Sequence, residues 1–549
     1  MNKYFIYRYV AYKKYLIFLP FLLLFIFILA RNFGLYPSVV DEYYYNKFSR
    51  LLPFNLLPVP IYLYSLIFKG TDLCRVGWLE CVRLLNLIFY FSAAPFIYFI
   101  SRRFTGQNLS AFIVFMSLAG VSNSYTAYFM PEAIYFFTFW ALVWTLIDVN
   151  NFYKISRLCI VGIVIGLLSL IKPHGLFLLV PILVYGIFNC YLNNRKYIVS
   201  IIKIFLFLII SCLATKFIIG FLLAGKAGIT FFGGFYSDHA VQITPSVQLY
   251  EVIKFFFFQY SAHLGFLILL FSTPIANGLI NYKNNKYTTN YIFFTIIFIG
   301  FLIAVSAAYT TAINFQAGIA QGLRLHLRYY SFALPLLLMM GSIVNDLKAK
   351  AFSNRLRLIV FLIFTFISCY FIATKFYPFT PNYVDGPEIR GFTTNILFFY
   401  LLSFLSLLSL IVWYFNSKKG LLLYFIIFLP SYILVSNYFI SNELRNRMFP
   451  SPFDNGAFLV KSILNQEQIG RLMIVGAPET AGILDLSMIY YDNVNVITKT
   501  IPENSDLNAS NIPKNIEWIL YIGKYNLGIN SIVNIDGPYF KLIKIDSAK

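Results

Sequence analysis

Long apolar segments separated by short polar stretches fill the first 440 residues of the chain. The first of them, within MNKYFIYRYVAYKKYLIFLPFLLLFIFILARNF, holds roughly twenty apolar residues, and no small-residue cleavage site follows it. This favours a retained membrane span over a signal peptide. Counted in the same way, the pattern predicts about thirteen spans. They lie near residues 15–34, 84–101, 108–124, 133–149, 157–171, 175–191, 198–221, 255–279, 290–309, 329–345, 357–374, 395–415 and 421–440.

Basic residues collect on every second loop between these segments. Lys3, Arg8, Lys13 and Lys14 precede the first span, and Lys and Arg accumulate on the cytoplasmic side of membranes. The N-terminus is therefore expected in the cytoplasm, and an odd number of spans puts the C-terminus on the opposite side. Every loop that this orientation assigns to the cytoplasm carries at least two cations: Arg102 and Arg103, Lys154 and Arg157, Arg195 and Lys196, Lys283 and Lys286, Lys348, Lys350, Arg355 and Arg357, and Lys418 and Lys419.

The pattern changes after about residue 441, where polar residues and strand-like runs replace the long apolar segments. The runs at 471–476, 494–501, 517–524 and 539–546 predict strands, and the stretches near 457–469 and 479–491 predict helices. We therefore expect an all-α polytopic membrane domain at 1–440, with a functional outer loop at 36–82. A small periplasmic α/β domain is expected at 441–549.

Composition supports a membrane protein and excludes two other classes. Hydrophobic residues make up 59% of the chain and charged residues only 12%, with a mean hydropathy of +0.72. Soluble domains carry about 25% charged residues, and disordered chains need low hydrophobicity. The net charge of +21 is explained by the cytoplasmic loops, so it does not point to a nucleic-acid partner.

Two of the six cysteines, Cys74 and Cys81, lie in the same outer loop, seven residues apart. On a continuous helix this spacing separates the two Cα atoms by roughly 10 Å, which is too far for a disulfide. We therefore expect both cysteines to be unpaired.

The predicted spans have no Asp or Glu near their middles, whereas ion-coupled transporters rely on intramembrane carboxylates. The polar chemistry lies instead at the outer membrane boundary. Asp41 and Glu42 directly follow the first span. A carboxylate near a low-dielectric boundary can have a raised pKa, which suits a general base. The alternative is a solvated acidic pair at the start of a loop. The following residues 50–80 predict short interfacial helices broken by prolines.

Further candidates lie on the same side of the membrane. Glu132 follows Pro131 at a helix start, where a structural carboxylate would interact favourably with the helix dipole. Lys172 and His174 belong to a turn at the outer end of a span. A cation there runs against the positive-inside tendency, so it indicates either a functional role or a snorkelling side chain. Arg83 stands at the outer start of the second span.

A basic run precedes the predicted span at 329–345. Arg324, His326 and Arg328 alternate in it and are followed by Tyr329. An extended segment would place the three basic residues on one face, whereas a helix would bring together only Arg324 and Arg328. Arginine forks suit phosphate, either of a substrate or of an anionic lipid headgroup.

Five pieces of the chain, in this order and topology, resemble the GT-C superfamily of polytopic glycosyltransferases. They are the pair DE after the first span, VRLLNLIFYFSAAPFIYFISRRFTG beginning near Arg83, MPE at 130–132, IKPHG at 171–175 and RLHLRYYSFALP at 324–335. The resemblance covers about the first 180 residues and the segment 324–335.

The resemblance implies a bacterial inner-membrane enzyme that moves a sugar, such as glucose, from a polyprenyl-phosphate donor to a periplasmic or lipid-linked glycan such as O-antigen. It implies inversion at the anomeric carbon, with Asp41 as the base and with Glu42 or Glu132 positioning the acceptor or a cation. The sequence requires no cofactor, and no DXD-like metal motif is present, although a divalent cation is compatible with the acids. The donor phosphate is assigned to Arg83, Lys172, Arg324 and Arg328, and the substrate-binding residues also include Glu132, His174, His326 and Tyr329.

Two other functions are weighed against this one. An O-antigen polymerase or ligase is expected to have its main functional loop late in the chain and rich in arginine, whereas here the acids are in the first loop. A lipid-linked oligosaccharide flippase or transporter is expected to line a central cavity with charged residues inside the spans, which the apolar segments do not provide.

Overall fold

The computed structural model describes residues 3–147, 154–192, 197–234, 249–282, 285–317, 324–343, 350–374, 385–507, 512–527 and 531–545. Four of the predicted cytoplasmic cations, Arg195, Lys196, Lys283 and Lys348, lie outside these residues, as do the last residues of the predicted spans 133–149 and 329–345.

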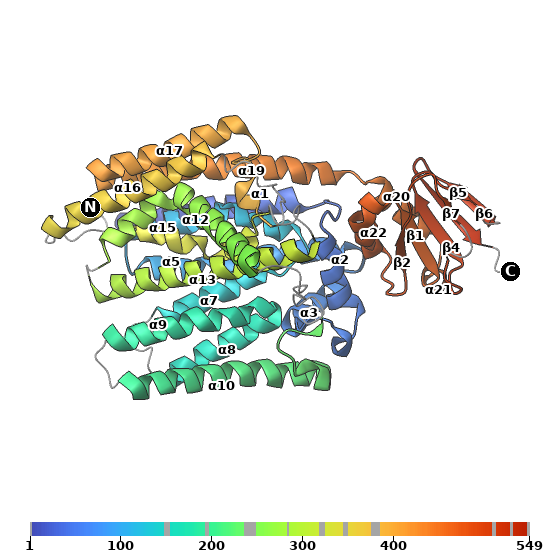
Figure 1. Ribbon diagram of the computed structural model, residues 1–549, viewed down its shortest axis with the longest axis horizontal. Coiled ribbons are helices and arrows are strands. Elements are labelled where there is room, and N and C mark those ends of the chain that lie inside the picture. Colours follow the sequence, from blue (N-terminus) through green and yellow to red (C-terminus); the bar gives the residue numbers. More distant parts are fainter. Residues whose placement is uncertain are drawn as a thin grey trace.

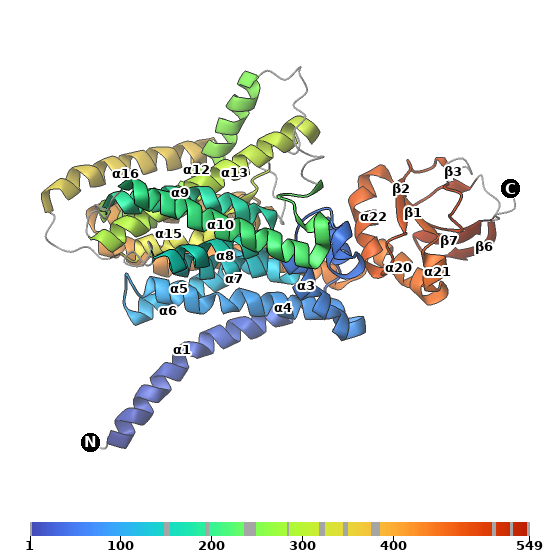
Figure 2. The ribbon, with the colours of Figure 1, turned by 90° about the horizontal axis from the view of Figure 1, so that it is seen from below.

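A bundle of long apolar helices forms the larger part of the molecule (Figure 1). Its outer surface exposes large side chains such as Leu22, Ile210 and Phe366, which is typical of a surface that faces lipid. The helices of the bundle are α1 (Lys3–Asn32), α4 (Trp78–Ser92), α5 (Ala94–Ser101), α6 (Gln107–Ala119), α7 (Glu132–Leu146), α8 (Ile155–Ile171), α9 (Leu179–Leu192), α10 (Tyr197–Ala224), α12 (Leu249–Ile280), α13 (Lys286–Ala317), α15 (Leu334–Gly341), α16 (Lys350–Ala373), α17 (Ile396–Phe415), α18 (Ser417–Leu423) and α19 (Leu429–Arg445). In Figure 2 the first half of α1 projects away from the other helices.

In the described residues, eight helices are long and apolar enough to cross a membrane, or nine if a pair bent by 50° counts as one span. Four shorter apolar helices accompany them. Each of the predicted spans coincides with one of these helices or with the bent pair, Gln107–Ala119 and Val121–Ala127. The all-helical membrane domain is therefore confirmed, while the number of crossings, the orientation of the termini and the boundary at residue 440 stay predictions.

The first outer loop folds into short helical pieces, as its prolines indicated. They are α2 (Val40–Asn46), η1 (Lys47–Leu51), η2 (Phe54–Leu56), α3 (Tyr62–Lys69) and η3 (Gly70–Gly77). Pro53 lies between η1 and η2, and Pro58 and Pro60 lie between η2 and α3. Proline removes a main-chain donor and clashes with the preceding turn, so the helical pieces are interrupted between η1 and η2 and between η2 and α3.

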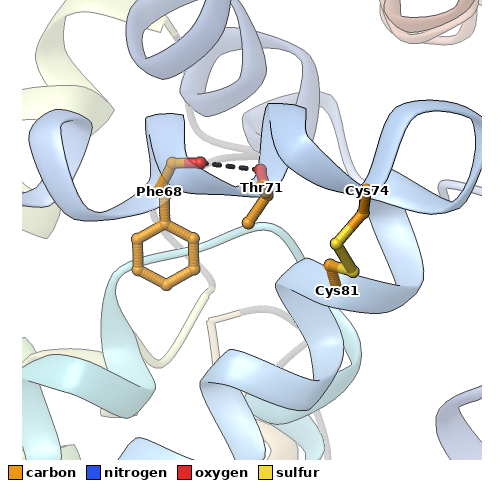
Figure 3. The surroundings of a disulfide bond; sticks show 4 residues. All are labelled: Phe68, Thr71, Cys74 and Cys81. Carbon is orange, nitrogen blue, oxygen red and sulfur yellow. Dashed lines mark hydrogen bonds between the residues drawn. A yellow bond between two sulfur atoms is a disulfide. The ribbon is translucent and has the colours of Figure 1, made fainter.

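The expectation that Cys74 and Cys81 are unpaired is wrong, because they form a disulfide with their Cα atoms 6.5 Å apart (Figure 3). The spacing argument assumed one continuous helix. Instead η3 ends at Gly77, α4 begins at Trp78, and Arg75 has a left-handed φ of 47°. This kink folds the chain back and brings the two cysteines within bonding distance.

The C-terminal domain (Pro452–Ile545) contains one five-stranded sheet in the order β2-β1-β4-β7-β6. β1 pairs in parallel with β2 and β4, whereas β7 pairs antiparallel with β4 and β6. All four predicted strands are present, as β1 (Leu472–Gly476), β2 (Ile497–Thr500), β4 (Trp518–Ile522) and β7 (Phe540–Ile545). The edge strand β6 (Ser531–Asp536) and the short pair β3 (Asp506–Leu507) and β5 (Asn526–Leu527) were not predicted.

Two apolar cores lie on opposite faces of this sheet. One contains Leu472 and Ile474 together with residues of the helices α20 (Pro452–Ile463) and α22 (Ala481–Ser487). The other contains Met473 and Val475 of the same strand. The short helix α21 (Gln466–Ile469) leads from α20 into β1.

Candidate functional site

Helix α2 directs the two adjacent acids to different surroundings, because successive side chains on a helix are about 100° apart. Glu42 is 1% exposed and accepts three main-chain hydrogen bonds, from Ser38 (2.8 Å) and Val39 (3.1 Å) at the helix start and from Phe129 (3.1 Å). Burial raises the pKa of Glu42, against the lowering effect of the nearby Arg83 charge. Glu42 therefore fixes the start of α2 against the helical bundle.

The Asp41 carboxylate points the other way and is 38% exposed. Its Oδ2 lies 2.9 Å from Nη1 of Arg328. An aspartate in this position is open to a substrate and is paired with a guanidinium from a segment 287 residues away.

Arg328 is the centre of the charged cluster. Its Nε lies 3.3 Å from Glu132 Oε1, and its Nη1 lies 3.5 Å from Asp385 Oδ1. Burial lowers the pKa of Arg328, but the charges of Glu132 and Asp41 outweigh it and raise that pKa well above its ordinary value. The guanidinium thus stays charged among three carboxylates.

Lys172 supplies a second buried cation. Its ammonium donates to Glu132 Oε1 at 2.9 Å and lies 5.2 Å from the centre of the Tyr329 ring. Burial lowers the pKa of Lys172, and the neighbouring Glu132 charge opposes this. The Glu132 carboxylate at the start of α7 therefore contacts both cations and holds Lys172 and Arg328 side by side.

The basic run converges on one carboxylate that the sequence did not indicate. Arg324, His326 and Arg328 lie 3.9, 3.7 and 3.5 Å from Asp385. Residues 324–326 are not helical, so the alternating side chains share a face, as the extended alternative predicted. Burial lowers the pKa of His326, with Asp385 opposing it.

Asp385 was missed because nothing in the sequence links it to the run 324–328. Its signal was its place in DGPE, an acidic turn in an outer loop between two predicted spans. The link is a main-chain hydrogen bond, in which Arg328 N donates to Asp385 O at 2.9 Å.

These charged residues border a cavity of about 540 Å³. Asp41, Lys172, His174, Arg328 and Tyr329 all line it. The first outer loop supplies most of the remaining wall, through Tyr44, Tyr45, Lys47, Phe48, Leu52, Leu56, Pro58, Val59 and Ile61. Pro173 and Tyr309 complete it. The cavity thus combines four charged side chains, Asp41, Lys47, Lys172 and Arg328, with a wall that is otherwise mostly apolar or aromatic.

An apolar cavity of about 270 Å³ adjoins the first. Four residues, Pro173, His174, Tyr309 and Tyr329, line both. The rest of its lining is Phe177, Phe232, Val305 and Ala308. The pair of cavities can accommodate a ligand that has a charged head and a hydrocarbon chain.

Arg83, like Glu42, Glu132, Arg324 and His326, does not line either cavity. It is 1% exposed and donates to the carbonyl oxygens of Leu35 (2.6 Å) and Ala127 (3.0 Å). It therefore joins two outer segments of the chain. Among the described residues, no group of three or more His, Cys, Asp or Glu side chains is arranged to hold a metal ion.

Part of the chain matches a known family, and its whole length matches solved structures. Residues 58–216, less than half of the chain, match the family described as dolichyl-phosphate-mannose-protein mannosyltransferase. ArnT from Cupriavidus metallidurans bound to undecaprenyl phosphate has 11% identity and a TM-score of 0.52, covering 96% of this chain and 97% of its own. The apo structure of the same ArnT has 12% identity and a TM-score of 0.47, covering 97% and 98%.

Among curated proteins no match was found. The identity to ArnT is low, so the likeness concerns the fold, and it extends through the membrane helices and the C-terminal domain alike. The protein is therefore a polytopic membrane protein with the fold of the GT-C glycosyltransferases.

Proposed function

We propose that this protein is a membrane glycosyltransferase that moves a sugar from a polyprenyl-phosphate donor to a hydroxyl group of a glycan. The observation that carries the proposal is that a partly exposed carboxylate, Asp41, and two buried cations, Lys172 and Arg328, line one cavity. Asp41 pairs with Arg328, and Lys172 pairs with Glu132. ArnT, which has the same fold, was solved with undecaprenyl phosphate bound, and this supports a lipid-phosphate donor here.

In the proposed reaction the donor phosphate binds at Lys172 and Arg328. Asp41 takes the proton from the acceptor hydroxyl as its oxygen attacks the anomeric carbon. The bond from that carbon to the phosphate oxygen breaks, and polyprenyl phosphate leaves with the bonding electrons. The two cations stabilise the charge on the leaving phosphate, and a single displacement inverts the anomeric centre.

The adjoining apolar cavity is suited to the first isoprene units of the donor, because it shares a wall with the charged one. Tyr329 and His174 stand in that shared wall, with ring centres 4.9 Å apart. Arg324 and His326 contact the site through Asp385 and support Arg328. Glu42 and Arg83 are assigned to the scaffold, since their polar atoms contact main-chain groups.

The finer parts of the proposal are a hexose such as glucose as the sugar and an O-antigen or other periplasmic or lipid-linked glycan as the acceptor. The enzyme would lie in a bacterial inner membrane, with the N-terminus in the cytoplasm and the C-terminal domain in the periplasm. Cysteines introduced at Lys3 and Lys524 would test this orientation, because only the second should react with a membrane-impermeant maleimide in intact spheroplasts.

The activity is tested by mass spectrometry of surface polysaccharide and lipid-linked glycans. Cells with the wild-type gene are compared with cells that lack it and with cells that carry Asp41→Asn, after the amount of each protein in the membrane has been measured. Asp536→Asn is a matched control, because its side chain is 71% exposed in the C-terminal domain. The proposal is supported if the glycans gain the mass of one sugar with the wild-type gene and with Asp536→Asn, but not without the gene or with Asp41→Asn. A change in chain length without a new sugar contradicts it and indicates polymerisation.

A further inference from the structure

Helix α2 lies between the helical bundle and the C-terminal domain (Figure 1). On one side Glu42 accepts the main-chain N–H of Phe129 in the bundle. On the other side Tyr43 is 4% exposed and belongs to the apolar core of the C-terminal domain, together with Val460, Met488 and Tyr491. One residue of the first loop is thus a core residue of a domain that lies more than 400 residues later in the chain.

Polar contacts add to this apolar one. The Tyr44 hydroxyl donates to Asp485 Oδ2 at 3.4 Å. Arg50, just after α2, pairs with Asp492 at 3.1 Å and with Asp72 at 2.6 Å. Its guanidinium also lies 3.9 Å from the centre of the Trp78 ring. Trp78 lies in the loop that the Cys74–Cys81 disulfide closes, and Asp72 lies two residues before it, so Arg50 connects this part of the chain to the C-terminal domain.

The chain that enters α2 is held in the same way. Tyr36 N donates to Arg447 O at 2.7 Å, and the Arg447 guanidinium donates to Pro37 O. Arg447 in turn pairs with Asp454 at 3.1 Å, at the start of α20. The residues before α2 and the residues after it are therefore both attached to the C-terminal part of the protein.

A helix of seven residues has little stability of its own, because helix nucleation is costly and few hydrogen bonds follow it. Its place depends on what it packs against. We propose that the C-terminal domain positions Asp41 for catalysis by holding α2 in two ways. Tyr43 is inserted into the apolar core of the domain, which we call the Tyr43 seat, and Arg50 pairs with Asp492. This inference rests on the proposed function of Asp41, and it assigns a role to a domain whose described residues do not line either cavity.

The first test compares Tyr43→Ala with Tyr43→Phe. Transfer is measured from undecaprenyl-phosphate glucose to lipid-linked glycans extracted from cells that lack the gene. Because a small displacement of a catalytic group costs roughly 100-fold, we expect Tyr43→Ala to lower kcat by about 10- to 100-fold. KM for the donor should change less than kcat, since Lys172 and Arg328 do not belong to α2. Tyr43→Phe keeps the ring and should restore kcat.

A matched control separates positioning from a general loss of stability. Tyr521 is 6% exposed in the core on the opposite face of the sheet, so Tyr521→Ala weakens the same domain without touching α2. We expect it to lower the unfolding temperature and to leave kcat at the assay temperature unchanged. An equal loss of kcat in Tyr521→Ala and Tyr43→Ala would overturn the inference.

A milder variant addresses the case in which Tyr43→Ala does not fold. Asp492 has φ of 50°, a conformation that asparagine also tolerates, so Asp492→Asn removes the charge and keeps the backbone. It should lower kcat several-fold, and the effects of Arg50→Ala and Asp492→Asn should not add. The proposed role of the pair would be contradicted if Asp492→Asn kept the wild-type kcat and the double variant lost only the kcat that Arg50→Ala loses alone.

Hydrogen exchange gives a readout that does not depend on activity. In Tyr43→Ala, main-chain amides of residues 36–52 should exchange at least tenfold faster, while those of α7 keep the wild-type rate. If the wild-type protein transfers no sugar, the proposed function fails. The exchange experiment then still tests whether Tyr43, by packing in the core of the C-terminal domain, orders residues 36–52. If the wild-type protein is active and Tyr43→Ala retains both its kcat and its exchange rates, only the positioning inference fails.

Discussion

Asp41 and Glu42 are neighbours in the chain, yet their carboxylates belong to two different parts of the molecule. Asp41 lines the large cavity and lies 2.9 Å from Arg328 Nη1. Glu42 is 1% exposed and accepts main-chain N–H groups from Ser38 at the start of the first outer loop and from Phe129 in the helical bundle. Replacing the carboxylate by its amide should therefore lower kcat at Asp41 and lower the stability of the fold at Glu42.

Asp41→Asn should lower kcat by at least about 100-fold, because general-base catalysis contributes roughly 10²- to 10⁴-fold. The unfolding temperature should change little, since the side chain is partly exposed. Turnover with undecaprenyl-phosphate glucose and thermal unfolding in the same detergent would measure both quantities. Full activity in this variant would remove Asp41 from the mechanism even if the fold assignment holds.

Glu42→Gln should mainly destabilise the protein, by roughly 1–3 kcal/mol, because an amide NH₂ group would face a main-chain donor in a buried position. The remaining folded fraction should turn over at nearly the wild-type rate. The measurement is the denaturant midpoint together with the specific activity of monodisperse protein. A kcat loss as large as that of Asp41→Asn, without loss of stability, would instead assign chemistry to Glu42.

Arg328→Lys should lower kcat/KM for the donor by about 100-fold or more, on the scale of losing one preorganised donor at a developing charge. A guanidinium presents several N–H groups in a fixed plane and contacts three carboxylates here, which a lysine ammonium cannot reproduce. Arg324→Lys is the control, because its one described ion pair is 3.9 Å long and its side chain is 32% exposed. Equal losses in the two variants would argue against a central role of Arg328.

Glu388 should make the stability of the protein depend on pH. Burial raises its pKa from 4.5 to about 7, so the folded state holds a proton that the unfolded state releases above about pH 4.5. The stabilisation is therefore complete below pH 4.5 and is lost as the pH rises to about 7, a change on the order of 3 kcal/mol. Glu388→Gln should abolish this decline, as seen in unfolding midpoints between pH 4.5 and 8. The same decline in both proteins would assign it to another group.

Loss of the Cys74–Cys81 disulfide should destabilise the first outer loop. A closed loop of this size contributes about 2.5 kcal/mol in the chain-entropy description. Trp78 inside the loop and Asp72 just before it both contact Arg50. We expect a lower unfolding temperature for Cys74→Ser with Cys81→Ser, and reduction of the wild-type protein should reproduce it. Alkylation of both cysteines without prior reduction would show that the bond does not form.

Local patterns in the sequence were sufficient for the elements and for some of the site. Apolar runs located the helices, and strand-like runs located β1, β2, β4 and β7. For Arg324, His326 and Arg328 the sequence left an extended and a helical arrangement open, and the structure has the extended one. These features depend on neighbours in the chain, which the periodicity of side chains reports directly.

The features that could not be predicted depend on distant partners or on single dihedral angles. The different roles of Asp41 and Glu42 follow from Phe129 and Arg328, which lie 87 and 287 residues away. Asp385 joins the site through the main chain of Arg328, and the disulfide depends on the backbone of Arg75. No periodicity carries such information.

The seat of Tyr43 in the C-terminal domain has a consequence for biosynthesis. Residues 36–52 leave the ribosome early, but their partners Arg447, Met488 and Asp492 are made near the end of translation. The loop that holds Asp41 therefore lacks these contacts while most of the membrane helices are being inserted. A nascent chain would gain activity only in its last stage of synthesis, so incomplete products would stay harmless to the lipid-linked sugars around them.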